Sequence, residues 1–197
     1  MSVQRDIDRP ATWAQAAVGS VVFVVALWVI EIVDAAMGND LDQYGVQPRE
    51  SDGLLGILFA PLLHGGWDHL SANTIPALVL AFLVLVSGIA RGLLVTAVIW
   101  LVGGIGVWLV APSNTVHLGA SVLIFGWLVY LMIRGIFTRR AGEIILDMVL
   151  FFMYGGLLLG VLPGQPGISW QGHLFGAIGG ALAAWLVGER TERASVI

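Results

Sequence analysis

Long apolar runs separated by short, turn-rich stretches are the feature that most limits what this chain can fold into. The runs are close to the roughly 20 residues that a helix needs to cross the hydrocarbon core of a bilayer. Six of them cover residues 11–33, 68–89, 92–110, 118–133, 144–162 and 169–187. Because backbone exposed to lipid must satisfy its hydrogen bonds within the segment, these runs predict α-helices.

The composition agrees with a membrane protein. Only 11% of the 197 residues are charged and the mean hydropathy is +0.91, whereas soluble domains have about 25% charged residues. We therefore expect an all-α polytopic membrane protein, with one domain over residues 1–197 and the lipid bilayer around it. We expect no nucleic-acid partner. The chain has no cysteine, so it forms no disulfide.

The arginines predict the orientation of the spans. Six spans place both termini on one side of the membrane, and eight of the nine basic residues fall on that side. Those eight are Arg5, Arg9, Arg91, Arg134, Arg139, Arg140, Arg190 and Arg193. Only Arg49 falls on the other side, so the positive-inside rule predicts cytoplasmic termini in a plasma (inner) membrane. Arg91 is expected to end the second span.

A shorter apolar segment precedes the second span. Residues 54–63 are apolar, but the segment has only ten residues and Pro61 interrupts it. Because it is too short to cross, we expect it to lie in the membrane interface or to dip in and return.

Polar side chains, which are costly in hydrocarbon, gather where the second, fourth and sixth spans begin. His69 and Asn73 are four residues apart and share one helix face, and His64 precedes them in a glycine-containing loop. Ser121 opens the fourth span and His173 opens the sixth. All of these starts lie on the outer side. Helix N-termini carry unpaired N–H groups and partial positive charge, which suits a developing oxyanion.

The sixth span has a face of small residues. Gly172, Gly176 and Gly180 are spaced four residues apart, and such faces let membrane helices approach closely. His173 borders this face, so a neighbour packed on it brings its own polar residue near the imidazole. The fourth span is the candidate neighbour, because it carries Ser121. Phe125, one turn further along that span, is expected to pack under the imidazole.

These residues resemble the rhomboid family of intramembrane serine proteases. The matching motifs are His64-x4-His69-x3-Asn73, Gly119-Ala120-Ser121, and His173 followed by Gly176 and Gly180. The resemblance covers all six predicted spans. It implies a six-transmembrane-helix rhomboid-like bundle with a membrane-embedded first loop, for which residues 54–63 are the match.

The resemblance also implies a role for each matching residue. Ser121 would be the nucleophile and His173 its general base, forming a Ser–His dyad that needs no metal or other cofactor. His69, Asn73 and the backbone N–H of Ser121 would form the oxyanion hole, with His64 supporting it. The implied substrates are transmembrane segments of other membrane proteins, cleaved near the outer face.

The sequence leaves alternatives open. Family members commonly have glycine after the nucleophile, where this chain has Val122, so a catalytically inactive relative that binds transmembrane helices is one alternative. Ser71 is a rival nucleophile, although it lies about 200° round the helix from His69. The histidines also suggest a metal-dependent hydrolase or a transporter. Against these, the chain has no H-E-x-x-H motif and no inverted repeat of its spans.

Overall fold

The computed structural model describes residues 11–138, 141–165 and 167–195, and its side chains through residue 187. The α-helices are α2 (Trp13–Ala36), α3 (Gly53–Phe59), α4 (Trp67–Val86), α5 (Ile89–Val110), α6 (Ser121–Thr138), α7 (Ala141–Tyr154) and α8 (Trp170–Ser195). The short 3₁₀-helices are η1 (Asp40–Tyr44), η2 (Ala60–Leu62) and η3 (Gly155–Val161). In these described ranges the chain forms no strand, only an isolated bridge between Val46 and His117.

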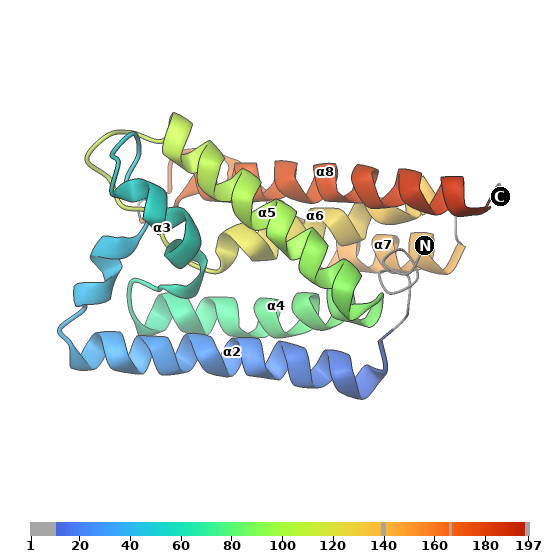
Figure 1. Cartoon of the computed structure of the whole chain (residues 1–197), viewed down its shortest axis with the longest axis horizontal. Coiled ribbons are helices and arrows are strands. Elements are labelled where there is room, and N and C mark those ends of the chain that lie inside the picture. The colour runs from blue at the N-terminus through green and yellow to red at the C-terminus, as the bar shows by residue number, and fades with distance from the viewer. Residues whose placement is uncertain (1–10, 139–140, 166, 196–197) are drawn as a thin grey trace.

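The long helices form a bundle that the short helices cover at one end (Figure 1). α2 lies beside α4 on one side of the bundle, and α5 crosses obliquely in front of α6. We refer to the end that carries η1, α3 and η2 as the α3 end. The start of α2 and the end of α8 both lie at the opposite end (Figure 1).

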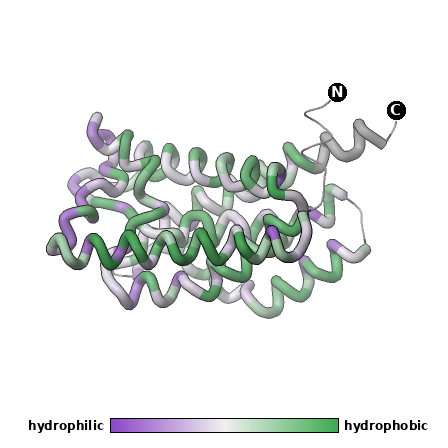
Figure 2. The backbone as a smooth tube through the Cα atoms, turned by 60° about the horizontal axis from the view of Figure 1, so that its bottom comes forward, coloured by the Kyte–Doolittle hydropathy of each residue, from purple (hydrophilic) through white to green (hydrophobic). Residues whose placement is uncertain are grey.

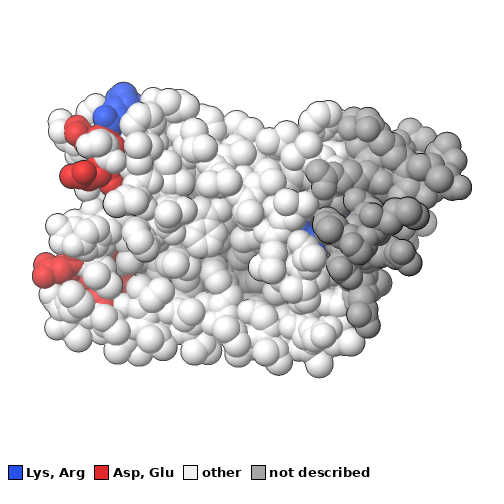
Figure 3. Space-filling view, in the orientation of Figure 1, with Lys and Arg blue, Asp and Glu red and all other residues white. Residues whose placement is uncertain are grey.

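Among the residues that the structure describes, five helical segments are long and apolar enough to cross a membrane. They are α2, α4, α5, α6, and α7 together with η3. Apolar residues line most of their length, while hydrophilic residues concentrate at the α3 end (Figure 2). Acidic side chains gather at this same end, with basic atoms beside them (Figure 3). The sixth predicted run, residues 169–187, lies largely within α8, which is not among these five segments.

Helix α6 is the centre of the packing and α7 is peripheral. In the apolar window of α6, 56% of the residues are buried, against 11% for Ala141–Val161. α8 lies directly on α6, because a Cβ built at Gly176 would collide with the Val122 carbonyl, and one at Gly180 with the Gly126 carbonyl. The glycines of α8 therefore bring two backbones into contact, as the small-residue face predicted.

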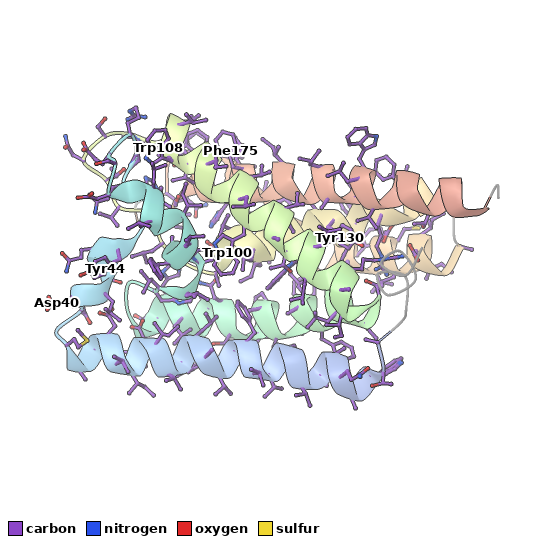
Figure 4. All side chains as sticks on the ribbon, in the orientation of Figure 1. Asp40, Tyr44, Trp100, Trp108, Tyr130 and Phe175 are labelled. Atoms are coloured by element: carbon purple, nitrogen blue, oxygen red, sulfur yellow. The ribbon has the colours of Figure 1, made fainter. Side chains whose placement is uncertain are left out.

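Tryptophans of α5 hold the α3 segment in place. The indole N–H of Trp100 donates to the Ile57 carbonyl at 2.6 Å, and that of Trp108 donates to the Glu50 carbonyl at 2.9 Å. Both side chains lie near α3 in Figure 4. The predicted short apolar segment is thus a folded helix, bonded to α5 through the half-buried Ile57 carbonyl and, just before the helix, through the exposed Glu50 carbonyl.

The fold corrects several predicted boundaries. α4 ends at Val86 and the chain turns at Gly88, whose φ is +135°, so Arg91 lies in the first turn of α5 instead of ending the second span. The fifth run is not one continuous α-helix. It leaves α-helical geometry at Tyr154 and continues as the 3₁₀-helix η3, which opens with two glycines, Gly155 and Gly156. Glycine is a poor helix former.

Part of the predicted arginine pattern lies outside the described residues. This applies to Arg5, Arg9, Arg139 and Arg140, and to the side chains of Arg190 and Arg193.

Candidate active site

Ser121 is the first residue of α6, directly after a sharp turn of the backbone. The predicted start at residue 118 is wrong, because residues 117–119 are tied to the loops at the α3 end. His117 and Val46 exchange two backbone hydrogen bonds, of 2.8 and 2.9 Å, and the Gly119 N–H donates to the Ala60 carbonyl at 2.8 Å. Gly119 then takes φ of +121°, a conformation that glycine adopts easily, and the helix begins.

Gly119 also brings the hydroxyl of Ser121 and the ring of His69 together. A Cβ built at Gly119 would lie 2.8 Å from His69 Nε2 and 3.6 Å from Ser121 Oγ. Any larger residue at this position would displace the imidazole. The turn therefore places a hydroxyl at the start of α6 next to a hydrogen-bonding ring on α4, as the predicted site requires.

Asn73 lies one turn after His69 on α4 and is buried, with 6% of its surface exposed. Its amide nitrogen Nδ2 has no hydrogen-bond partner among the described residues. Buried polar groups in folded proteins are nearly always paired, so this donor is available to a water molecule or a bound ligand.

His64 packs behind His69, in the loop before α4. It is 1% exposed, its ring centroid lies 5.2 Å from that of His69, and its Nε2 accepts a long hydrogen bond, 3.4 Å, from the Ala120 N–H. Burial, with a smaller effect from the charge of His69, lowers the pKa of His64 to about 4. The ring is therefore neutral near pH 7 and accepts a hydrogen bond at the turn before Ser121.

His173, in the first turn of α8, is 8% exposed and held by two contacts. Its ring stacks on that of Phe125, with centroids 3.9 Å apart and planes 10° apart. Its Nδ1 lies 2.9 Å from the Gly160 carbonyl oxygen. The stacking is the contact expected from the sequence, whereas the Gly160 carbonyl was not expected.

The contact between α6 and α8 brings Ser121 and His173 to the same level of the bundle. Both helices begin at the α3 end, and Gly176 meets the backbone of Val122. Ser121 is one residue before Val122, and His173 is about one helical turn before Gly176. The two side chains therefore belong to the first turns of two helices in backbone contact.

A small pocket of about 30 Å³ opens beside Ser121. A volume of this size holds about one or two water molecules. Its lining is mostly apolar and comes from α3, η2, α5, the turn before α6 and the start of α8. The residues are Val46, Ile57, Ala60, Pro61, Gly103, Gly104, Val107, His117, Leu118, Gly119, Ser121, Val122, Ser169 and Gly172.

Sequence reasoning missed one polar pair in this lining. His117 Nδ1 lies 2.7 Å from Ser169 Oγ, and its Nε2 lies 2.8 Å from Thr115 Oγ1. Ser169 Oγ also accepts the Gly172 N–H at 3.2 Å. The pair joins the turn before α6 to the start of α8. No sequence spacing signals it, because 52 residues separate its members. Burial lowers the pKa of His117 below its ordinary value.

Val122, the departure from the family pattern, has a steric explanation. A Cβ built at Gly103 of α5 would collide with Val122 Cγ2. The valine therefore fills the space that this glycine leaves on the neighbouring helix, while it also lines the pocket beside Ser121.

The histidines do not form a metal centre in the part of the chain that the structure describes, where no three His, Cys, Asp or Glu side chains are grouped to hold an ion. Two of the histidines make short hydrogen-bond contacts instead, His117 with Ser169 and His173 with the Gly160 carbonyl.

Apolar helices long enough to cross a bilayer, with a polar cluster at one end of the bundle, define an integral membrane protein. The rhomboid domain matches residues 51–190, and the chain belongs to the rhomboid family.

Several curated proteins are similar to the chain. It is 46% identical to an uncharacterised protein of Mycobacterium tuberculosis, over 98% of this chain and 89% of that protein. It is 45% identical to an uncharacterised protein of Mycobacterium leprae, over 97% and 80% respectively. A Bacillus subtilis protein, YdcA, named as a candidate rhomboid protease, is 34% identical over 67% of this chain and 66% of its own length. No solved structure gives a significant match.

Proposed function

We propose that the protein is an intramembrane serine endopeptidase that hydrolyses peptide bonds in transmembrane segments of other membrane proteins. The proposal depends most on the arrangement at Gly119, where the Ser121 hydroxyl and the His69 ring both lie close to the position that a Cβ atom would take. Membership of the rhomboid family supports it. Topology is part of the proposal: α8 is the sixth span, the termini are cytoplasmic, and the α3 end faces outward with α3 embedded in the membrane surface.

The first half of the reaction forms an acyl-enzyme. His173 Nε2 takes the proton of Ser121 Oγ as the oxygen attacks the substrate carbonyl carbon. The carbonyl oxygen becomes an oxyanion, which accepts hydrogen bonds from His69, from Asn73 Nδ2 and from the Ser121 N–H. The imidazolium of His173 then protonates the departing amine as the C–N bond breaks, which leaves an ester on Ser121.

The second half restores the serine. A water molecule gives a proton to His173 and attacks the ester, and the C–O bond to Ser121 breaks as His173 returns the proton to Oγ. The small pocket beside Ser121 has room for this water. Besides Ser121, His117 and Ser169 contribute polar side chains to its lining.

We infer that a substrate helix reaches Ser121 between α4 and α7. In support, α7 with η3 is the least buried of the five apolar segments. The chain has no cysteine of its own. One engineered disulfide from α4 to η3 would therefore be the only cross-link, and it would prevent these two segments from separating to admit a substrate helix. Cleavage of a single-pass substrate should stop when the disulfide forms and return on reduction. Undiminished cleavage in the oxidised protein would exclude lateral access at this seam.

A fluorophosphonate probe tests the catalytic proposal. We expect the detergent-solubilised protein to react with the probe and to cut a model single-pass substrate, and Ser121→Ala to do neither. Ser71→Ala is the matched control, because Ser71 is an exposed serine on α4 and should keep both activities. Labelling that persists in Ser121→Ala would refute the assignment.

A catalytically silent relative that binds transmembrane helices is the second candidate. It is favoured by Val122, whose side chain lines the pocket where the family commonly has glycine. In that case the natural chain neither reacts with the probe nor cuts substrate, yet retains a transmembrane segment in a binding assay. Val122→Gly separates the two readings, because activity that appears only in this variant assigns the loss to the valine.

A further inference from the structure

The imidazole of His173 meets a backbone carbonyl on the side away from its proposed base nitrogen. Nδ1 lies 2.9 Å from the oxygen of Gly160, in η3. A carbonyl oxygen only accepts hydrogen bonds, so the hydrogen of a neutral ring paired with it is on Nδ1. The lone pair is then on Nε2, which is the form that a general base requires.

The end of η3 leaves the Gly160 carbonyl without the N–H donor that a continuing 3₁₀-helix would supply. η3 ends at Val161, and Leu162 is extended, with φ of −84° and ψ of 140°. The next residue is Pro163, which has no N–H to donate. The last carbonyls of a helix lack N–H partners within the helix, and Pro163 has no N–H to donate to the carbonyl three residues before it.

Glycine at position 160 is what allows so close an approach. A Cβ built there would lie 2.9 Å from Phe125 Cζ and 3.1 Å from His173 Nδ1. Both distances are tighter than those at ordinary van der Waals contact, so a side chain at this position would push on the stacked pair of rings.

We propose that the Gly160 carbonyl is a positioning group, the third partner of Ser121 and His173, which holds the imidazole in the Nδ1–H tautomer. The proposal rests on the proposed function. Phe125 sets the plane of the ring, and the carbonyl sets which nitrogen faces Ser121. Since η3 continues the peripheral helix α7, any displacement of η3 removes this acceptor. The ability of His173 to act as a general base therefore depends on η3 remaining packed beside it.

The tautomer is measured directly by long-range ¹H–¹⁵N correlation on protein labelled with ¹⁵N-histidine in micelles. The spectrum is taken at alkaline pH, where the ring is neutral, and the His173 signals are identified by their loss in His173→Ala. We expect one protonated Nδ1 and one bare Nε2 in the natural chain. Gly160→Ala should give a mixture of tautomers. Its kcat should fall by about 10- to 100-fold, as expected for a hydrogen bond to a ring that becomes charged, with little change in KM.

Gly156→Ala is the matched control, because it makes the same change in η3 at a site where a Cβ meets nothing within 4 Å. It should keep the natural tautomer and rate. A natural chain with the proton on Nε2 of His173, or a Gly160→Ala variant indistinguishable from Gly156→Ala in both measurements, would overturn the proposal. The tautomer is read without substrate. A chain with the expected tautomer but no probe labelling would thus reject the protease function and leave the carbonyl contact standing.

Discussion

The ring of Phe125 lies parallel to the imidazole of His173, with centroids 3.9 Å apart and planes 10° apart. The two residues lie on different helices, α6 and α8, whose backbones touch at Gly176 and Gly180. The stack is therefore a consequence of how closely those helices pack. It fixes the plane of the ring beside the start of α6.

Replacing Phe125 with leucine should slow catalysis while leaving substrate affinity intact. An aromatic stack contributes about 0.5–1.5 kcal/mol, which corresponds to a loss in kcat of roughly 2- to 10-fold. Steady-state cleavage of a single-pass substrate measures the effect. Phe137→Leu, the same change near the other end of α6, is the control. Equal kcat in the two variants would contradict an orienting role for the stack.

Asn73→Ala should lower the catalytic rate without lowering the stability of the fold. The substitution removes an oxyanion donor, so kcat should fall by about 10²–10³-fold. It also removes a buried amide nitrogen that has no partner among the described residues, and such a group costs about 1–3 kcal/mol. The Tm should therefore stay unchanged or rise. A variant that keeps its full rate, or that loses its rate only because it unfolds, would exclude Asn73 from the oxyanion hole.

Gly180→Ala should destabilise the bundle. The added methyl group collides with the Gly126 carbonyl, and overpacking of this kind costs about 1–3 kcal/mol. Thermal unfolding in detergent should show a lower Tm, together with reduced probe labelling at Ser121. Gly142→Ala is the control, because its Cβ meets nothing within 4 Å. A normal Tm for Gly180→Ala would mean that α6 and α8 are not in backbone contact there.

Acidification should destabilise the protein through His64. Its pKa is about 4 in the folded chain, against an ordinary value of 6.5. Between these two values the unfolded chain binds a proton that the folded chain does not. The contribution of this ring to the free energy of unfolding is therefore fully present above pH 6.5 and is lost as the pH drops towards 4. The loss attributable to this ring is about 3 kcal/mol.

The Tm of the natural chain and of His64→Asn, measured across this pH range, isolates that contribution. We expect the natural chain to lose more stability on acidification than the variant does. Parallel curves for the two proteins would show that His64 is not buried in its neutral form.

Much of the fold followed from local features of the sequence. The apolar runs became helices because a helix satisfies its backbone hydrogen bonds within one segment, wherever that segment packs. The polar residues His69, Asn73 and His173 lie in the first turns of their helices, as the hydropathy pattern predicted. Boundaries were less predictable. The break of the fifth run at Tyr154 and the start of α6 at Ser121 depend on glycine geometry and on contacts with distant loops.

By itself, the sequence determined that the chain forms apolar helices with a serine, histidines and an asparagine near their starts. Hydropathy and helical periodicity are properties of residues that are close together in the sequence, so they can be recognised without tertiary information. Only the tertiary structure decided which groups meet: the Gly160 carbonyl with His173, His117 with Ser169, and the His69 ring with Gly119. These contacts depend on how closely separate segments approach one another. That distance is determined jointly by the side-chain volumes and the backbone geometry of residues that are far apart in the chain.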